Sequence, residues 1–410
     1  MKKINFIDLF AGAGGMSEGF VRAGFNPIAH VEMNANACKT LVTRSAFHYL
    51  KETNQLDKYK DYLTGKCTHE ELLTNLPPTV KESVHNYEIS DDNISEIFKK
   101  IDKNLNKDIK VDLIIGGPPC QAYSLLGRHK IDVENDPRNV LYKQYGKFLK
   151  KYKPKAFVFE NVLGLLTANK GQYFEDIKTH FSNLGYNIDF RVLDASNYGV
   201  LQNRKRVIIV GWKAINGVNH EFPMPDVLAT STTINAIFAD LPSLKPGDII
   251  NVVNQEEVVS DNLKKHSLDS SIGITTQHIT RPHNKRDLAI YKLAIETWNT
   301  QKVRIKYTDI PKIHRTHNNT ESFLDRFKVV DGTSISHTLV AHIAKDGHHY
   351  IHPDVNQCRS ISVREAARIQ SFPDDYFFEG PRTAAFTQIG NAVPPLLAYA
   401  IAKKLKEKLI

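Results

Sequence analysis

Cys120 follows two prolines directly after a short apolar run, a placement typical of a nucleophile at the end of a buried strand. The run VDLIIGG is rich in β-branched residues and ends in glycines, as buried parallel strands do. In open α/β sheets, ligands bind beyond the carboxyl ends of such strands. Pro118 and Pro119 fix the backbone angle φ and present Cys120 on a stiff turn. The alternative is a buried structural cysteine, and Cys120 alone does not decide between the two.

An acid and two arginines stand at comparable places elsewhere in the chain. Glu160 ends the apolar run 156–159, where a carboxylate is costly unless it is paired or used. Its alternative role is to cap the helix that follows. The segment QNRKR precedes the apolar run 207–210, and strand alternation would send Arg204 and Arg206 to one side. Each of these features alone has an ordinary structural explanation, since a basic run is usually a solvated face.

The first forty residues have the pattern of a cofactor site. The segment FIDLFAGAGGMSEGF predicts a strand, a turn containing Gly12, Gly14 and Gly15, and a helix whose positive end faces that turn. Ser17 stands where the last glycine of GxGxxG belongs, so a nicotinamide or flavin site is disfavoured. Glu32 ends a second apolar run about twenty residues after the first glycine, where an acid accepts hydrogen bonds from ribose hydroxyls. A nucleoside-containing cofactor is therefore favoured over an ordinary strand–helix turn.

Composition limits the class of protein. The 410 residues include 54 Lys and Arg against 45 Asp and Glu, which gives a formal charge of +9 and a pI near 9.1. This modest excess permits a polyanionic partner without requiring one. No apolar stretch approaches the length of a membrane span, and Asp8 interrupts the apolar N-terminal segment, so we expect a soluble, cytoplasmic protein. The four cysteines form no CxxC pair and the histidines have no cysteine partners, which disfavours a metal site.

Six motifs, taken in order, resemble those of the DNA (cytosine-5) methyltransferases of the compact bacterial type. They are FIDLFAGAGG, GGPPCQAYS, ENV, QNRKR, RSISVREAARIQSFP (359–373) and IGNAVPP (389–395). The series covers the catalytic region in family order and leaves only the middle segment unassigned. The resemblance implies an α/β fold, with the Rossmann-like sheet of the S-adenosylmethionine-dependent methyltransferases and a second, smaller, irregular or β-rich target recognition domain.

The resemblance implies methyl transfer from S-adenosylmethionine to carbon 5 of a specific cytosine in double-stranded DNA, without a metal. Carbon 5 is a poor nucleophile, so the thiolate of Cys120 must first add to carbon 6. Glu160 is then expected to bond the ring nitrogen and the exocyclic amine of the base. Arg204 is expected to hold the carbonyl oxygen of the base and support Cys120, with Arg206 bracing the site.

A base inside a duplex cannot be attacked in this way, so the target cytosine must be flipped out of the helix. The polar loop after the nucleophile, residues 121–139, is expected to close behind it. Gln121 and Ser124 in this loop are expected DNA contacts.

The resemblance also places the cofactor. It implies that Phe10 faces the adenine, the glycine turn the methionine portion and Glu32 the ribose. An acid after the third strand is expected to bond the adenine amine. The resemblance favours Asp91 for this role, and Asp92 is the other candidate. The alternative role of both acids is to cap a helix. The full set of expected cofactor contacts is Phe10, Ala11, Gly12, Gly14, Gly15, Glu32, Met33, Asp91, Pro119, Leu141, Asn391 and Val393.

The order of the motifs implies that the chain leaves the catalytic domain and returns to it. Residues 1–213 would form its first part, residues 214–336 the target recognition domain, and residues 337–410 the return. Within the return, Ser362 and Glu365 form a capping-box pattern that predicts a helix start.

The middle segment has the composition of a small domain that reads base edges with polar side chains. Its helical stretch RPHNKRDLAIYKLAIETW offers Arg281, Lys285 and Arg286 as expected phosphate contacts.

Three alternatives stand beside this interpretation. They are a tRNA cytosine-5 methyltransferase of the same fold, a catalytically silent DNA-binding relative, and a nicotinamide oxidoreductase. The full-sized middle segment disfavours the first, the intact Cys120, Glu160 and Arg204 the second, and the glycine spacing the third. We expect a monomeric bacterial enzyme associated with the nucleoid, with a cognate restriction endonuclease as a possible partner. The sequence does not predict which DNA site is recognised.

Overall fold

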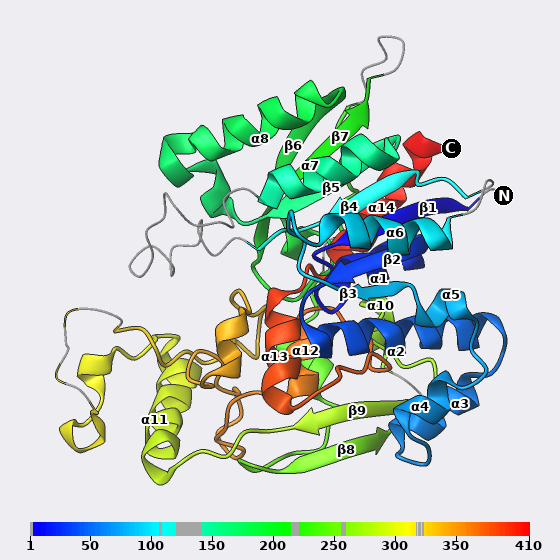
Figure 1. The fold of residues 1–410 in the computed structure, drawn as a ribbon. Coiled ribbons are helices and arrows are strands. Elements are labelled where there is room, and N and C mark those ends of the chain that lie inside the picture. The colour runs from blue at the N-terminus through cyan, green and yellow to red at the C-terminus, as the bar shows by residue number, and fades with distance from the viewer. Residues whose placement is uncertain are drawn as a thin grey trace.

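The computed structural model describes residues 3–105, 109–119, 141–214, 221–228, 230–255, 260–316, 318, 321 and 324–410. Figure 1 shows a large sheet with helices on both faces in the upper half of the molecule, and helices with a second sheet in the lower half. Within the described residues, no helix has both the length and the apolar character needed to cross a membrane.

The main sheet contains seven strands of the described chain in the order β3-β2-β1-β4-β5-β7-β6. Their bounds are β1 (Ile4–Leu9), β2 (Phe25–Glu32), β3 (Val84–Asn86), β4 (Leu113–Gly116), β5 (Ala156–Asn161), β6 (Tyr186–Asp194) and β7 (Lys205–Lys213). Strands β1 to β5 are parallel to one another, whereas β7 runs antiparallel to both β5 and β6. This arrangement confirms the expected Rossmann-like methyltransferase sheet. It places the carboxyl ends of β1, β2, β4 and β5 along one edge, with the start of β7 beside the end of β5.

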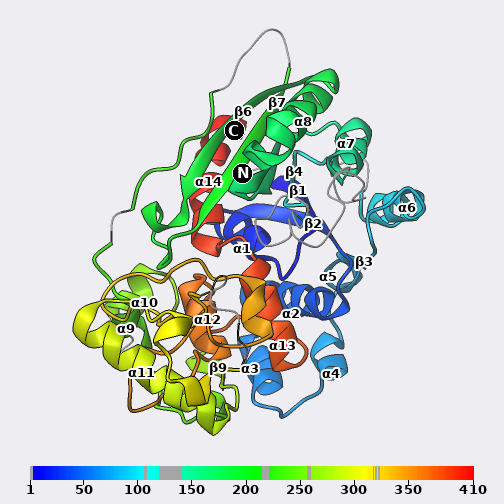
Figure 2. The same ribbon diagram turned by 90° about the vertical axis from the view of Figure 1, so that its left-hand side faces the viewer.

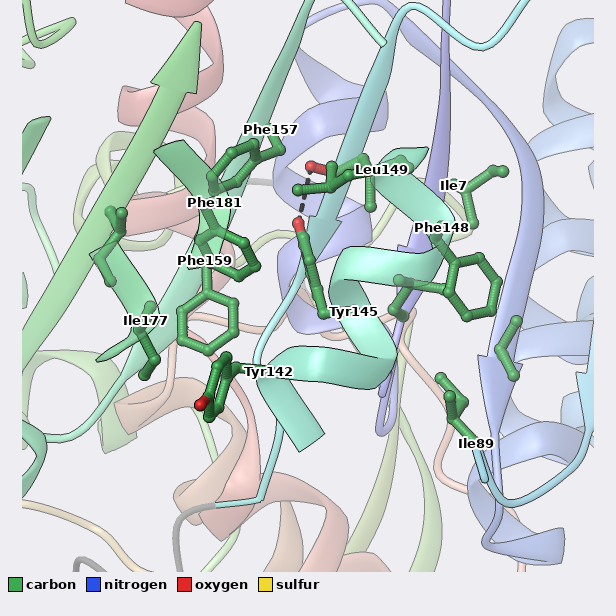
Figure 3. Packing of buried hydrophobic residues seen from close by; sticks show 14 of the residues in the cluster. Ile7, Ile89, Tyr142, Tyr145, Phe148, Leu149, Phe157, Phe159, Ile177 and Phe181 are labelled. Carbon is green, nitrogen blue, oxygen red and sulfur yellow. Dashed lines mark hydrogen bonds between the residues drawn. The ribbon is translucent and has the colours of Figure 1, made fainter. Parts of the chain in front are cut away.

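Three amphipathic helices cover one face of this sheet: α6 (Ile94–Asn104), α7 (Leu141–Tyr152) and α8 (Gln172–Asn183). Figure 3 shows Tyr145 of α7 beside the aromatic side chains of Phe157 and Phe159 in β5, and Phe148 of the same helix on the side of Ile7 in β1. The hydroxyl of Tyr145 donates towards carbonyl oxygens of β4 and β5, at 3.0 and 3.1 Å. Aromatic packing therefore fixes β4, which leads to Cys120, and β5, which carries Glu160.

The opposite face is covered by α1 (Gly15–Arg22) and by α14 (Pro395–Leu409), the C-terminal helix. The two helices approach so closely that a Cβ at Gly19 would lie 2.4 Å from the backbone nitrogen of Tyr399. The chain thus returns to the main sheet at its end, and Figure 1 shows the red C-terminal helix beside blue β1.

The lower half contains the remaining elements. Residues 35–81 form four helices of the described chain, α2 (Ala35–Glu52), α3 (Leu56–Leu63), α4 (His69–Leu73) and α5 (Pro78–Lys81). The middle segment forms β8 (Ile249–Asn254), which pairs antiparallel with β9 (Ile274–Ile279), and the helices α9 (Ile234–Phe238), α10 (Asp261–Lys265) and α11 (Lys285–Gln301). Figure 2 shows α9, α10 and α11 grouped beneath the sheet, beside α12 (Val363–Ile369) and α13 (Arg382–Asn391). One apolar cluster joins α9 and α10 to α12 and α13.

Helix α12 is fixed by charges as well as by apolar packing. The predicted capping box is present, because the Ser362 hydroxyl accepts the Glu365 amide and the Glu365 carboxylate accepts the Ser362 amide. Arg368 is fully buried and bonds the carboxylates of Asp374 and Asp240. Since a buried charge without its partner costs several kcal/mol, these ion pairs join α12 firmly to the middle segment.

Candidate active site

The turn after β1 is held by the carboxylate of Glu32. Phe10 and Gly12 have positive φ angles of 56° and 54°, and Gly14 begins helix α1 in the left-handed conformation. The Glu32 carboxylate accepts hydrogen bonds from the amides of Gly12 (2.8 Å) and Asn34 (2.8 Å). Glu32 therefore connects the turn after β1 to the turn after β2, at the edge where it was predicted.

The return segment lies against the same turn. A Cβ at Gly15 would lie 2.3 Å from the carbonyl oxygen of Val393, so glycine is needed for this approach. Val393 is buried, whereas Asn391 at the end of α13 is exposed. The IGNAVPP motif and the glycine turn, at opposite ends of the chain, are thus neighbours in the fold.

Asp8 is a residue near this turn that sequence reasoning missed. Its Oδ2 atom is buried without a hydrogen-bond partner, and burial, followed by the nearby Glu32, raises its pKa well above the usual range. A protonated carboxyl group both donates and accepts hydrogen bonds. The sequence feature that indicates a functional role for Asp8 is an acid at the penultimate position of a buried strand.

These groups fit an adenosine-containing cofactor. A Cβ at Gly12 would meet no atom within 4 Å, so the space over the turn is open. The helix start behind the turn, the acid Glu32 and the unpartnered oxygen of Asp8 supply donors and acceptors around this space.

The two acids expected at the adenine lie away from the strand end. Strand β3 ends at Asn86, and Asp91 and Asp92 are exposed in the turn before α6. The carboxylate of Asp91 is bonded by the Lys147 ammonium and by Gln144 (3.0 Å), both on α7, and these bonds lower its pKa. The position differs from the expectation because β3 is only three residues long.

The other expected cofactor residues are spread around the same edge. Ala11 donates its amide to the carbonyl of Val31 (3.2 Å), and Met33 is 63% exposed directly after Glu32. Pro119 is exposed and Leu141 is the first residue of α7. Cys120, Gln121 and Ser124, with the rest of the loop 121–139, lie outside the described residues.

Glu160 is packed against the turn that leads to Cys120. A Cβ at Gly117 would lie 2.7 Å from Glu160 Oε2, so the glycine allows the carboxylate to approach the backbone. The side chain of Asn161 donates to the carbonyl of Pro118 (3.3 Å). The ENV motif therefore holds the GGPP turn, as expected for two motifs of one site.

Arg206 forms an ion pair with Glu160. Its Nε lies 2.7 Å from Glu160 Oε1, and the two side chains are only 11% and 12% exposed. The antiparallel pairing of β5 with β7 brings them together, because β7 starts where β5 ends. The pair presents a cation and an anion at one end of the sheet, which suits a planar heterocycle with both donors and acceptors.

Arg204 is held differently from Arg206. It is fully buried, and its guanidinium donates to the carbonyls of Leu339 (2.6 Å), Ala392 (2.8 Å) and Gly390 (3.3 Å). Strand alternation predicted that both arginines point to one side. Because β7 begins at Lys205, Arg204 precedes the strand and the alternation does not extend to it.

Two glutamines extend this buried network. Gln202 donates to Gln370 and accepts the amide of Leu339 (3.0 Å), and Gln370 donates to the carbonyl of Ala392 (2.6 Å). Sequence reasoning missed both, although Gln202 begins the QNRKR motif. The network joins that motif to RSISVREAARIQSFP and IGNAVPP.

The three predicted phosphate contacts have unequal surroundings. Arg281 is half-buried and donates to the carbonyls of Ile343 (2.6 Å) and Ala344 (3.2 Å), so its guanidinium is bonded within the fold. Lys285 and Arg286 are exposed in the first turn of α11. Across the described residues, no group of three or more His, Cys, Asp or Glu side chains is arranged to hold a metal ion.

Comparison with known proteins agrees with this geometry. The family model for C-5 cytosine-specific DNA methylases matches residues 4–74 and 81–407. Type II methyltransferase M.Bpa9945I of Bacillus paralicheniformis is 42% identical over 98% of each chain, and type II methyltransferase M.AgeI of Thalassovita gelatinovora is 31% identical over 98% of each chain.

Solved structures show the same fold. A prophage-encoded E. coli protein, assigned as a DNA modification methyltransferase, superposes with a TM-score of 0.64 at 22% identity over 99% of each chain. The Entamoeba histolytica methyltransferase EhMeth superposes with a TM-score of 0.56 at 15% identity over the full length of both chains. Enzymes of the matched family use S-adenosylmethionine, for which the glycine turn is suited. The chain belongs to the C-5 cytosine-specific DNA methylases.

Proposed function

We propose that this chain transfers a methyl group from S-adenosylmethionine to carbon 5 of one cytosine within a specific sequence of double-stranded DNA, with Cys120 as the nucleophile. The observation that carries the proposal is the Glu160–Arg206 ion pair, which lies beside the GGPP turn immediately before Cys120. A thiol, a carboxyl group and a guanidinium at one strand edge are the groups that addition to a cytosine ring requires.

In the proposed reaction the Cys120 thiolate adds to carbon 6 of a flipped-out cytosine. Glu160 bonds N3 and the exocyclic amine, and it favours protonation of N3 as electrons move into the ring. Carbon 5 becomes nucleophilic and takes the methyl group. Loss of the carbon 5 proton and departure of the Cys120 sulfur then restore the aromatic ring.

The geometry suggests different roles for the two arginines from those expected from the sequence. Arg206, paired with Glu160, is proposed as the residue beside the carbonyl oxygen of the base. Arg204, bonded to three backbone carbonyls, is proposed as a positioning residue that holds the QNRKR segment against the return segment.

S-adenosylmethionine, when bound, would supply an activated methyl group and leave as S-adenosylhomocysteine. We propose that Glu32 bonds its ribose, that Phe10 lies against its adenine, and that Asp8 bonds its charged amino acid end. The bonds of Asp91 to α7 give that residue less support as the adenine contact than the sequence suggested.

We further propose that the enzyme is the modification member of a restriction-modification system. Relatives at 42% and 31% identity over nearly the whole chain are named type II methyltransferases. Bisulfite sequencing of DNA from cells that express the protein tests this role, because such an enzyme methylates one cytosine position in every copy of one short sequence. Scattered methylation without a common sequence would contradict it.

The nucleophile is tested with Cys120→Ser. We expect methyl transfer to fall below detection while S-adenosylmethionine still binds, because serine is a far weaker nucleophile than a thiolate. Transfer of tritiated methyl groups to DNA and equilibrium binding of the cofactor measure the two properties. Cys67→Ser, at a half-buried cysteine, is the control. Full activity of Cys120→Ser would exclude the mechanism.

A further inference from the structure

The segment after α11, residues 302–316, carries an exposed isoleucine at its tip. Ile313 is 84% exposed. Among the other large apolar side chains of the described chain, only the C-terminal Ile410 is similarly exposed, and the next is Val227 at 67%. Figure 1 shows this segment as the yellow ribbon that projects beyond α11 at the lower left of the molecule. A single exposed apolar side chain is ordinary, so its surroundings decide what it does.

The tip is firmly held. Ile305, Tyr307 and Ile310 are buried in one apolar cluster with α11. The amide of Thr316 donates to the Tyr307 hydroxyl (2.6 Å), and Arg315 Nε donates to the Ile310 carbonyl (2.8 Å). Three apolar side chains of the segment therefore point inward, and the short 3₁₀ helix Lys312–His314 presents Ile313 outward.

The segment that carries Ile313 is strongly basic. Residues 302–316 contain Lys302, Arg304, Lys306, Lys312 and Arg315 against the single acid Asp309. The carboxylate of that acid is occupied, because it accepts the backbone amide of Lys306 (2.7 Å). Protein–protein interface cores are depleted in lysine, so an apolar tip on a segment rich in lysine and arginine fits a polyanion better than a protein.

The tip is also connected to the active site. The cluster that anchors it includes Val329, and the chain that continues from there bonds the QNRKR segment. The Ser336 amide donates to the Leu201 carbonyl (2.9 Å), and the Asn203 amide donates to the Ser336 carbonyl (2.9 Å). Asn203 immediately precedes Arg204, so the fold fixes the position of the tip relative to the Glu160–Arg206 pair.

We propose that Ile313 is an apolar wedge that presses between base pairs of the duplex while exposed cations of its segment, Lys312 among them, bind its phosphates. This proposal rests on the proposed function, in which the substrate is duplex DNA. Apolar side chains that enter base steps unstack them, and lysines and arginines around such a wedge release counterions from the backbone. Unstacking near the target lowers the cost of flipping a cytosine out of the helix.

The wedge is tested with Ile313→Ala, Ile313→Leu and Lys312→Gln on duplexes that contain the methylated sequence. We expect Ile313→Ala to lower kcat/KM for DNA about ten-fold, with the KM for S-adenosylmethionine unchanged, and Ile313→Leu to stay within about two-fold of wild type. Val227→Ala, which truncates another exposed apolar side chain, is the matched control and should leave both constants unchanged.

Two further measurements separate a wedge from a general loss of affinity. Duplexes with 2-aminopurine placed at successive steps should show a fluorescence increase with wild type that Ile313→Ala lacks. Lys312→Gln should weaken binding to all duplexes. It should also reduce the salt slope, the slope of the logarithm of DNA affinity against the logarithm of salt concentration, by about one.

The possible failures are distinguishable. If Ile313→Ala matches Val227→Ala while wild type methylates DNA normally, the wedge is wrong and the proposed function stands. If wild type methylates no DNA, the proposed function fails and the wedge with it.

Discussion

The carboxyl edge of the main sheet and the irregular region between β7 and α12 hold their charged side chains in opposite ways. At the sheet edge, Glu32 and Glu160 lie at the carboxyl ends of two parallel strands, β2 and β5, and each is bonded at the point where its strand ends. In the irregular region, Arg281 is bonded to carbonyls within the fold, whereas the segment after α11 carries exposed basic side chains and an exposed tip. Strand topology alone sets where a charge lies in the first region, and local contacts set it in the second.

The difference between the two regions is tested most directly by replacing Arg204 and Arg206, which lie at the start of β7. Arg206→Met removes the partner of Glu160, and we expect kcat to fall about 10²- to 10³-fold, with about 1 kcal/mol of stability lost because one hydrogen-bonded ion pair is removed. Arg204→Met leaves three buried carbonyls without their donor, and we expect a loss of about 3 kcal/mol in the free energy of unfolding.

Urea unfolding and single-turnover methyl transfer measure these two properties. Lys205→Met, at the exposed residue between the arginines, is the control and should change neither by much. If the two arginine variants lose stability and activity in equal proportion, the division between a base-contacting and a positioning arginine is wrong.

A second test compares how the two regions respond to acid. Burial lowers the pKa of His30 in β2 to about 4, and likewise that of His352 beside α12. Each folded-state pKa lies below the unfolded value near 6.5, so the unfolded chain binds more protons below that pH. The stabilisation is complete above about pH 6.5 and is lost as pH falls towards 4, by up to about 1.4 kcal/mol per pH unit for each histidine.

The two tryptophans report the regions separately, since Trp212 lies in β7 and Trp298 in α11. In Trp298→Phe the remaining Trp212 reports the sheet, and in Trp212→Phe the remaining Trp298 reports the irregular region. We expect the urea midpoints of both variants to be lower at pH 5 than at pH 7.5. A His30→Gln variant should reduce the pH dependence seen by Trp212. A midpoint that is unchanged between these pH values would show that the buried histidines do not titrate on unfolding.

The sheet edge was predictable from the sequence because it depends on local patterns. Apolar β-branched runs predicted the strands, the residue after each run predicted what lies at the edge, and parallel topology brought Glu32, Glu160 and the GGPP turn together. The prediction failed where an element was shorter than its pattern suggested. Strand β3 ends before Asp91, and β7 starts after Arg204, so register arguments did not reach either residue.

The buried network of Gln202, Arg204 and Gln370 was not predictable for a different reason. Its bonds go to backbone carbonyls far away in the sequence, and no periodicity in the sequence records such contacts. The same holds for Arg281, which looked like a free cation in a basic stretch. A charge in a sequence indicates that a partner exists, but only the fold decides whether that partner is a carbonyl or a phosphate.

The smallest effects are expected when a cation that binds a DNA phosphate is compared with one that is bonded to backbone carbonyls. Arg286→Gln removes an exposed cation at the start of α11, and we expect DNA affinity to fall two- to five-fold, with the salt slope reduced by about one, because one phosphate contact is lost. Arg281→Gln removes donors to two carbonyls, and we expect about 1 kcal/mol less stability with the salt slope unchanged. Binding titrations at three salt concentrations and urea unfolding measure both variants. If Arg286→Gln and Arg281→Gln reduce the salt slope equally, Arg281 leaves its carbonyls to contact the DNA. The irregular region would then rearrange on DNA binding, whereas the sheet edge would not.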